Sequence, residues 1–166
     1  YLDVQVSATF SQDDQCISVP GFWESGDTYK IRFSPPTSGK WRYKTHSTVP
    51  ELNGKSGIVK VTEAKGDNHG PIEILNTFYL RYADGTPYHQ FGTTCYAWVH
   101  QQRELQEHTL KTLATSPFNK IRFCVFPKSY VYNSNEPEFF AFKKGADDKF
   151  DFSRPNPAFW QHLEKQ

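Results

Sequence analysis

The chain has 166 residues, with 19 basic and 18 acidic side chains and a formal net charge of +1. This length accommodates one large domain or two small ones. The balanced charge argues against a nucleic-acid partner, and no apolar stretch reaches the roughly 18 residues that a membrane span needs, so no membrane partner is expected. Methionine is absent and the last residues, FWQHLEKQ, read as an unfinished helix, which predicts a piece of a larger protein.

The first 66 residues predict a β-sandwich made of short strands. Apolar and polar residues alternate over residues 2–10, 29–33 and 41–45, and shorter apolar runs lie at 16–19 and 58–61. Alternation of this kind is typical of half-buried strands. The sequence Ser-Gln-Asp-Asp at 11–14 predicts a turn, and the Pro-rich segment 34–39 predicts the connection of a hairpin between 29–33 and 41–45.

The polar segment 63–71 contains two glycines and a proline and predicts the boundary to a second domain, residues 67–166. Alternation over 78–82, followed by Ala-Asp-Gly at 83–85, predicts a hairpin whose other arm runs from 87 to 94. Residues 102–114 lack Gly and Pro and predict a helix. The apolar run at 120–126 predicts a strand covered on both faces, so these elements form a β-α-β unit.

The segment from 127 to 154 is long and rich in Tyr and Phe, and it predicts a docked loop with a functional role. Asn156 and Pro157 then predict the start of a second helix, with Asn at the N-cap and Pro in the first turn. One β-α-β unit cannot bury both faces of a parallel sheet, so the remaining strands are expected elsewhere in the parent protein.

Three cysteines (Cys16, Cys95 and Cys124) lie far apart and form no CxxC pair, which predicts buried or free thiols and favours a reducing, cytoplasmic compartment. His100 and His108 lack a third partner at metal-ligand spacing, so packed or surface roles are expected. Nucleotide-binding and acyl-transfer motifs are absent, and neither a metal nor a cofactor is predicted.

Candidate binding residues follow the two strands of the predicted β-α-β unit. In parallel α/β folds, ligands bind at the carboxyl ends of the strands. Aromatic rings beside hydroxyl and cationic groups suit a polyhydroxylated ligand, although these aromatic residues serve equally well as core. Arg122, inside its apolar strand, has either a structural salt bridge or a substrate-facing role. The residues are Thr93, Thr94, Tyr96, Trp98, Arg122, Lys128 and Tyr130.

Glu136 is a catalytic candidate of a different kind. The sequence Asn135-Glu136-Pro137 is similar to the Asn-Glu-Pro motif that carries the acid/base glutamate of many retaining barrel glycosidases. In those enzymes the motif follows the fourth barrel strand, whereas here it follows the second strand of its domain. A retaining mechanism also needs a second carboxylate about 5–5.5 Å away, which the sequence does not identify. Ordering of the loop or contact with the end of a substrate are the alternative roles.

Three segments, NHGPIEI (68–74), YADGTPYHQFGTTCYAW (82–98) and FNKIRFCVFPKSYVYNSNEP (118–137), resemble a bacterial family of glycoside hydrolases. In that family an immunoglobulin-like sandwich precedes an apiosidase-like (β/α)₈ barrel. The segment PGFWESGDTYKIRFSPPTSGKWRYKT (20–45) resembles a hairpin of that sandwich. The resemblance implies that Asp84 to Pro87 leads into the first barrel strand, that 121–126 is the second, and that the main catalytic carboxylates come from later strands.

The functional hypothesis is therefore the N-terminal part of a glycoside hydrolase that acts on O-glycosidic bonds by two-carboxylate chemistry. Its expected partners are a carbohydrate substrate and the remainder of its own barrel. The alternative is a non-catalytic carbohydrate- or protein-binding module, with the sandwich as its recognition surface. A purely structural role between domains is the third possibility.

Overall fold

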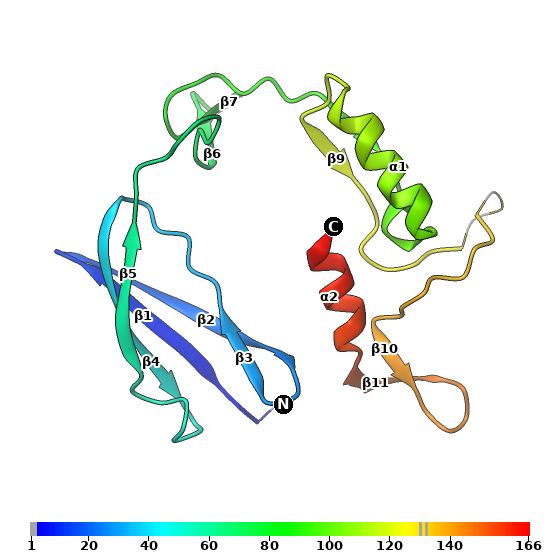
Figure 1. The fold of residues 1–166 in the computed structure, drawn as a ribbon, viewed down its shortest axis with the longest axis horizontal. Helices are drawn as coiled ribbons and strands as arrows, with labels where there is room; N and C mark the ends of the chain where they lie inside the picture. Colours follow the sequence, from blue (N-terminus) through cyan, green and yellow to red (C-terminus); the bar gives the residue numbers. More distant parts are fainter. Residues whose placement is uncertain (1–2, 130, 132) are drawn as a thin grey trace. The chain divides into compact units, whose positions relative to one another are not determined.

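The computed structural model describes residues 3–129, 131 and 133–166, and it divides into two compact units between His69 and Gly70 (Figure 1). This division falls inside the polar segment 63–71. Each unit has its own sheet structure. The first unit is all β, and the second contains the helices together with short strands.

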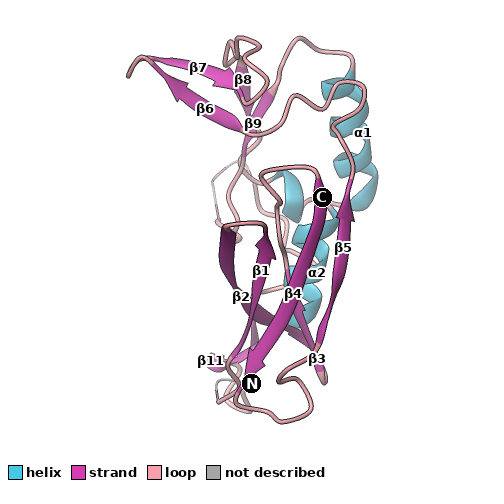
Figure 2. Ribbon diagram, turned by 90° about the vertical axis from the view of Figure 1, so that its left-hand side faces the viewer, coloured by secondary structure: helices cyan, strands magenta, loops and turns pink. Residues whose placement is uncertain are grey.

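From residue 3 onward, the first unit forms one antiparallel sheet of five strands in the order β3-β2-β1-β4-β5. A β-rich first unit was expected from the alternation, and the structure confirms it. Strands β1, β4 and β5 lie side by side (Figure 2). The strand bounds are β1 Val6–Gln12, β2 Gln15–Ser25, β3 Thr28–Ile31, β4 Gly39–Ser47 and β5 Ser56–Val61.

One face of this sheet carries the core. Ala8, Phe10 and Trp41 are buried, and Trp41 is fully enclosed, with its indole Nε1 donating to the carbonyl oxygen of Thr37 at 3.0 Å. Ile31 of the edge strand β3 and Val61 of the opposite edge strand both pack against this cluster, so the sheet curls around it. The predicted turn at 11–14 is confirmed as the two-residue connection between β1 and β2.

The predicted hairpin between 29–33 and 41–45 is wrong. Strand β3 pairs with β2, and β4 pairs with β1 and β5, so two strands separate β3 from β4. The connecting segment instead places Phe33 on the core, where its ring stacks on Phe10 at 3.9 Å and meets Trp41 edge-on at 5.1 Å. Alternation specifies which face of a strand is buried, but it does not specify the pairing partner.

The described residues of the second unit form three two-stranded sheets, two α-helices and one 3₁₀ helix. The hairpin β6–β7 opens it, and β8 and β9 form a parallel pair that is linked by η1 and α1. The hairpin β10–β11 and helix α2 follow. The bounds are β6 Ile72–Leu75, β7 Tyr79–Tyr82, β8 Gly92–Thr94, η1 Trp98–His100, α1 Arg103–Ala114, β9 Lys120–Arg122, β10 Phe142–Lys144, β11 Phe150–Pro155 and α2 Pro157–Lys165.

The predicted β-α-β unit is confirmed. Gly92, Thr93 and Thr94 of β8 pair in parallel with Lys120, Ile121 and Arg122 of β9, and helix α1 makes the crossover. The second strand is shorter than the predicted 120–126. Val125 and Phe126, at the end of the predicted strand, lie beyond β9, are 38% and 54% exposed and are not covered on both faces by the described residues. Among the helices of the described residues, none is long and apolar enough to cross a membrane.

Three local features of the second unit differ from the predictions. The arm 87–94 pairs with the strand 79–82 only at its start, at the Arg81–Pro87 bridge, where the Tyr88 N–H donates to the Leu80 carbonyl oxygen at 3.0 Å, and β7 also pairs with β6. The segment 127–154 is not entirely loop, since it contains the β10–β11 hairpin. Asn156 precedes α2, but its side-chain amide donates to the Phe140 carbonyl oxygen at 2.9 Å and makes no capping hydrogen bond.

Candidate functional site

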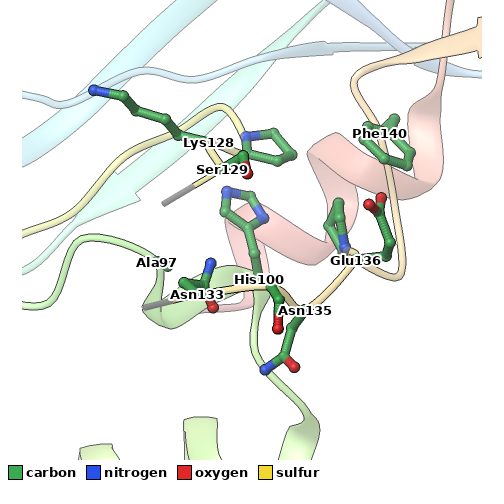
Figure 3. A pocket seen from close by; sticks show the side chains of 11 residues that line it. Ala97, His100, Lys128, Ser129, Asn133, Asn135, Glu136 and Phe140 are labelled. Atoms are coloured by element: carbon green, nitrogen blue, oxygen red, sulfur yellow. The ribbon is translucent and has the colours of Figure 1, made fainter. Parts of the chain in front are cut away.

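A pocket of about 210 Å³ lies among the segments that follow the carboxyl ends of β8 and β9. The segment after β8 contributes Ala97 and His100, and the segment after β9 contributes the larger share of the lining. In Figure 3 the His100 imidazole lies between Asn133 and Glu136, and the Lys128 side chain extends away from it. The lining residues after β9 are Pro127, Lys128, Ser129, Asn133, Ser134, Asn135, Glu136, Pro137 and Phe140.

His100 forms the buried base of this pocket. Its side chain is 8% exposed, and its Nε2 lies 3.1 Å from the carbonyl oxygen of Val125, to which the neutral ring donates. The ring also stacks on Phe159 of α2 at 6.0 Å. Burial lowers the pKa of His100 below its ordinary value of 6.5, against the opposing effect of the carbonyl groups of Cys124 and Val125. His100 is therefore a neutral, oriented imidazole at pH 7.

Gln101 ties the two strand-end segments together. Its side-chain Nε2 donates to the carbonyl oxygen of Ala97 at 3.2 Å and to Oδ1 of Asn133 at 2.9 Å. Its Oε1 accepts a hydrogen bond from Nδ2 of Asn135 at 2.8 Å. One amide thus fixes the backbone before η1 and two positions of the loop around Glu136. These hydrogen bonds place the Asn-Glu-Pro sequence next to η1.

Glu136 lines the pocket and also a neighbouring hollow of about 390 Å³. The two spaces share His100, Asn135 and Glu136, and the second adds the carboxylates of Glu104 and Glu138. Glu136 is exposed, so a ligand reaches its carboxylate directly. Carboxylates, amides and an imidazole together provide hydrogen-bond donors and acceptors for a ligand rich in hydroxyl groups.

Two of the predicted binding residues lie in contact at the carboxyl ends of the paired strands β8 and β9. The guanidinium of Arg122 lies 5.2 Å from the ring centroid of Tyr96, a cation–π arrangement. Both side chains are exposed. Arg122 is opposite Thr94 in the strand register, so Thr94 lies beside this pair. Arg122 lies at the end of β9, whose strand neighbour among the described residues is β8, and its side chain is at the surface.

The remaining predicted residues are separated. Trp98 is 5% exposed, its indole Nε1 donates to the Gln106 carbonyl oxygen at 3.1 Å, and its ring meets Phe123 edge-on at 5.6 Å. It contributes packing beneath the site. Thr93 is half-buried in β8, Lys128 is exposed in the pocket wall, and Tyr130 lies outside the described residues.

Sequence reasoning missed the role of Gln101 and the carboxylates Glu104 and Glu138. No motif marks them: Gln101 and Glu104 reach Glu136 only through folding, and Glu138 lies two residues beyond it in the chain. Within residues 3–129, 131 and 133–166, no group of three His, Cys, Asp or Glu side chains has the arrangement of a metal site, and the three cysteines form no disulfide. The candidate site therefore consists of ordinary polar side chains.

Comparison with known proteins shows what the chain is similar to. A domain of unknown function, DUF5060, matches residues 1–48. No curated protein matches the chain. A solved structure described as a putative glycoside hydrolase from Bacteroides vulgatus ATCC 8482 is similar, with a TM-score of 0.93 and 41% sequence identity. The similarity covers 98% of this chain and 34% of that protein, so the chain spans about a third of the length of its structural neighbour.

Proposed function

We propose that the chain is the N-terminal part of a glycoside hydrolase, with an immunoglobulin-like first unit and a second unit that opens an apiosidase-like (β/α)₈ barrel. The observation that carries this proposal is the similarity to a glycoside hydrolase-like protein over 98% of the chain at 41% identity. The parallel β8–α1–β9 unit supports the barrel, since repetition of this unit builds one. The pocket beyond the ends of β8 and β9 supports the location of the sugar site.

The pocket side chains would act as one sector of that sugar site. The amides of Asn133 and Asn135 and the carboxylate of Glu136 present hydrogen-bonding groups to sugar hydroxyls. Tyr96, with Arg122 against its ring, offers an exposed aromatic face to the C–H side of a sugar. Such a division between ring faces and polar groups is the usual way in which a protein orients a carbohydrate.

Hydrolysis in this proposal follows two-carboxylate chemistry. A general acid protonates the oxygen of the leaving group, while a second carboxylate attacks the anomeric carbon or activates water. Glu136 is the candidate from this chain, and it lies near Glu104 and Glu138 in the neighbouring hollow. Its partner carboxylate is expected from later barrel strands. His100, held by its hydrogen bond to the Val125 carbonyl oxygen, lines the same pocket as Glu136.

The test is hydrolysis of a panel of aryl glycosides by the parent protein that contains this chain. Glu136→Gln should lower kcat/KM about 10²-fold or more if the carboxylate transfers a proton. A binding contact alone should raise KM about tenfold or less. Glu107→Gln is the matched control, because Glu107 is exposed on α1 and pairs with Arg103 at 3.0 Å. Absence of hydrolysis across the panel, or equal effects of both variants, would refute the proposal.

A further inference from the structure

The face of the first sheet that points away from the core carries a cluster of cations, defined by Lys40, Arg42, Lys44 and Lys60 and called the basic face below. On β4 the buried or half-buried residues Trp41, Tyr43 and Thr45 alternate with these exposed side chains. In the register, Lys40 lies directly opposite Lys60 of β5. All four therefore project from the same side of the sheet.

The neighbouring positions on the same face are neutral. Arg42 is flanked by Ser11 on β1 and Ile58 on β5, and Lys44 is flanked by Thr9 and Ser56. Among the described residues, none of the four cations takes part in an ion pair. Like charges directly opposite each other on adjacent strands destabilise a sheet, so the Lys40–Lys60 pair is a cost to folding that a bound anion would relieve.

The basic face also includes a shallow groove. A hollow of about 580 Å³ is lined by hydroxyl groups of Thr9, Ser11 and Ser56 together with Arg42 and Lys44. Successive cations on β4 are about 7 Å apart, because they are two residues apart on a strand. The groove thus offers evenly spaced positive charges with hydrogen-bonding hydroxyls between them.

We propose that the basic face binds an acidic polysaccharide, a glycan chain that carries carboxylate or sulfate groups. Charge complementarity identifies the ligand as a polyanion, and the hydroxyl-lined strip suits sugar hydroxyls between its charges. A nucleic acid is disfavoured because the chain as a whole is nearly neutral, with a formal net charge of +1. The choice of a glycan among polyanions rests on the proposed function, whereas the presence of an anion site does not.

The experiment measures binding of the chain to polygalacturonate by titration calorimetry, with neutral dextran and duplex DNA as comparison ligands. The double variant Arg42→Gln/Lys44→Gln should weaken polygalacturonate binding roughly tenfold at low salt, since two charge contacts are lost. The matched control is Lys111→Gln/Lys165→Gln, which removes the same charge from exposed positions on α1 and α2 and should leave binding unchanged. Added salt should weaken binding by the unmodified chain. Equal melting temperatures of the two variants establish that both are folded.

The inference is overturned if polygalacturonate does not bind, if dextran binds equally well, or if both double variants weaken binding alike. Tighter binding of DNA would also overturn it and assign the face to nucleic acid. Binding that persists while the parent protein hydrolyses no aryl glycoside would refute the proposed function and leave the basic face as a glycan site. Hydrolysis without polygalacturonate binding would support the proposed function and overturn the inference about the basic face.

Discussion

Replacement of Gln101 by Met should loosen the loop that carries Glu136. Methionine has a similar length but none of the polar atoms of the amide, so the variant removes all three hydrogen bonds of that side chain. Two of these reach the loop, at Asn133 and Asn135. With a net contribution of about 1 kcal/mol for each hydrogen bond, the loop loses about 2 kcal/mol, or roughly thirtyfold in its local opening equilibrium.

Limited proteolysis with a protease of broad specificity measures this effect. Cleavage within residues 133–136 should be about thirtyfold faster in Gln101→Met, because cleavage follows the population of the opened loop, while the strands of the first unit stay resistant. Gln102→Met is the matched control, because Gln102 is the adjacent exposed residue and should alter none of these bonds. Unchanged cleavage at 133–136 would refute the role of Gln101, as would an equal acceleration in the control.

Two further predictions concern stability. Gly39→Ala should lower the free energy of unfolding by about 1–3 kcal/mol in urea titration, because Gly39 has φ +117° and a Cβ there would meet the Gln12 side chain. Gly26→Ala is the control, since Gly26 has φ +49° and open space around it, and it should lower this free energy by less. Equal losses in the two variants would contradict the reasoning. Burial lowers the pKa of His100 in the folded chain, so the unfolded chain takes up the proton at a higher pH than the folded chain does. The free energy of unfolding should therefore fall as the pH drops below about 6.5, and it should become constant below the lowered pKa of the folded chain. His100→Gln should remove this slope and the exposed His108→Gln should keep it; a slope that survives His100→Gln would assign the effect to another group.

The elements that local patterns specify were predictable. The helix now assigned to Arg103–Ala114 follows from an uninterrupted run without Gly or Pro, and its position between two apolar runs predicted the parallel pairing of β8 and β9. The turn between β1 and β2 follows from its Asp residues, because Asp13 has φ +49°, a conformation that Asp tolerates better than most residues. In each case the information lies within a few neighbouring residues.

The features that depend on distant partners were not predictable. Alternation over 29–33 indicates a strand, but only the packing of Phe33 on Phe10 explains why the chain crosses the core instead of turning into a hairpin. The candidate site shows the same limit. Arg122 and Lys128 were identified by their positions at strand ends, whereas the hydrogen bonds of Gln101 join residues more than 30 positions apart. The spacing of apolar and polar residues in the sequence does not predict such a contact.

The lysines of the first sheet have a consequence for self-association. The sheet ends in β3 on one side and β5 on the other, and edge strands offer unpaired backbone groups to other chains. Lys30 lies exposed on β3 and Lys60 lies exposed on β5. Lys30 pairs with Glu24, whereas Lys60 takes part in no ion pair among the described residues. A second copy that approached through β5 would have to desolvate the Lys60 ammonium group and bring like charges together. A side chain that invites a polyanion therefore also keeps two such sheets from joining along this edge.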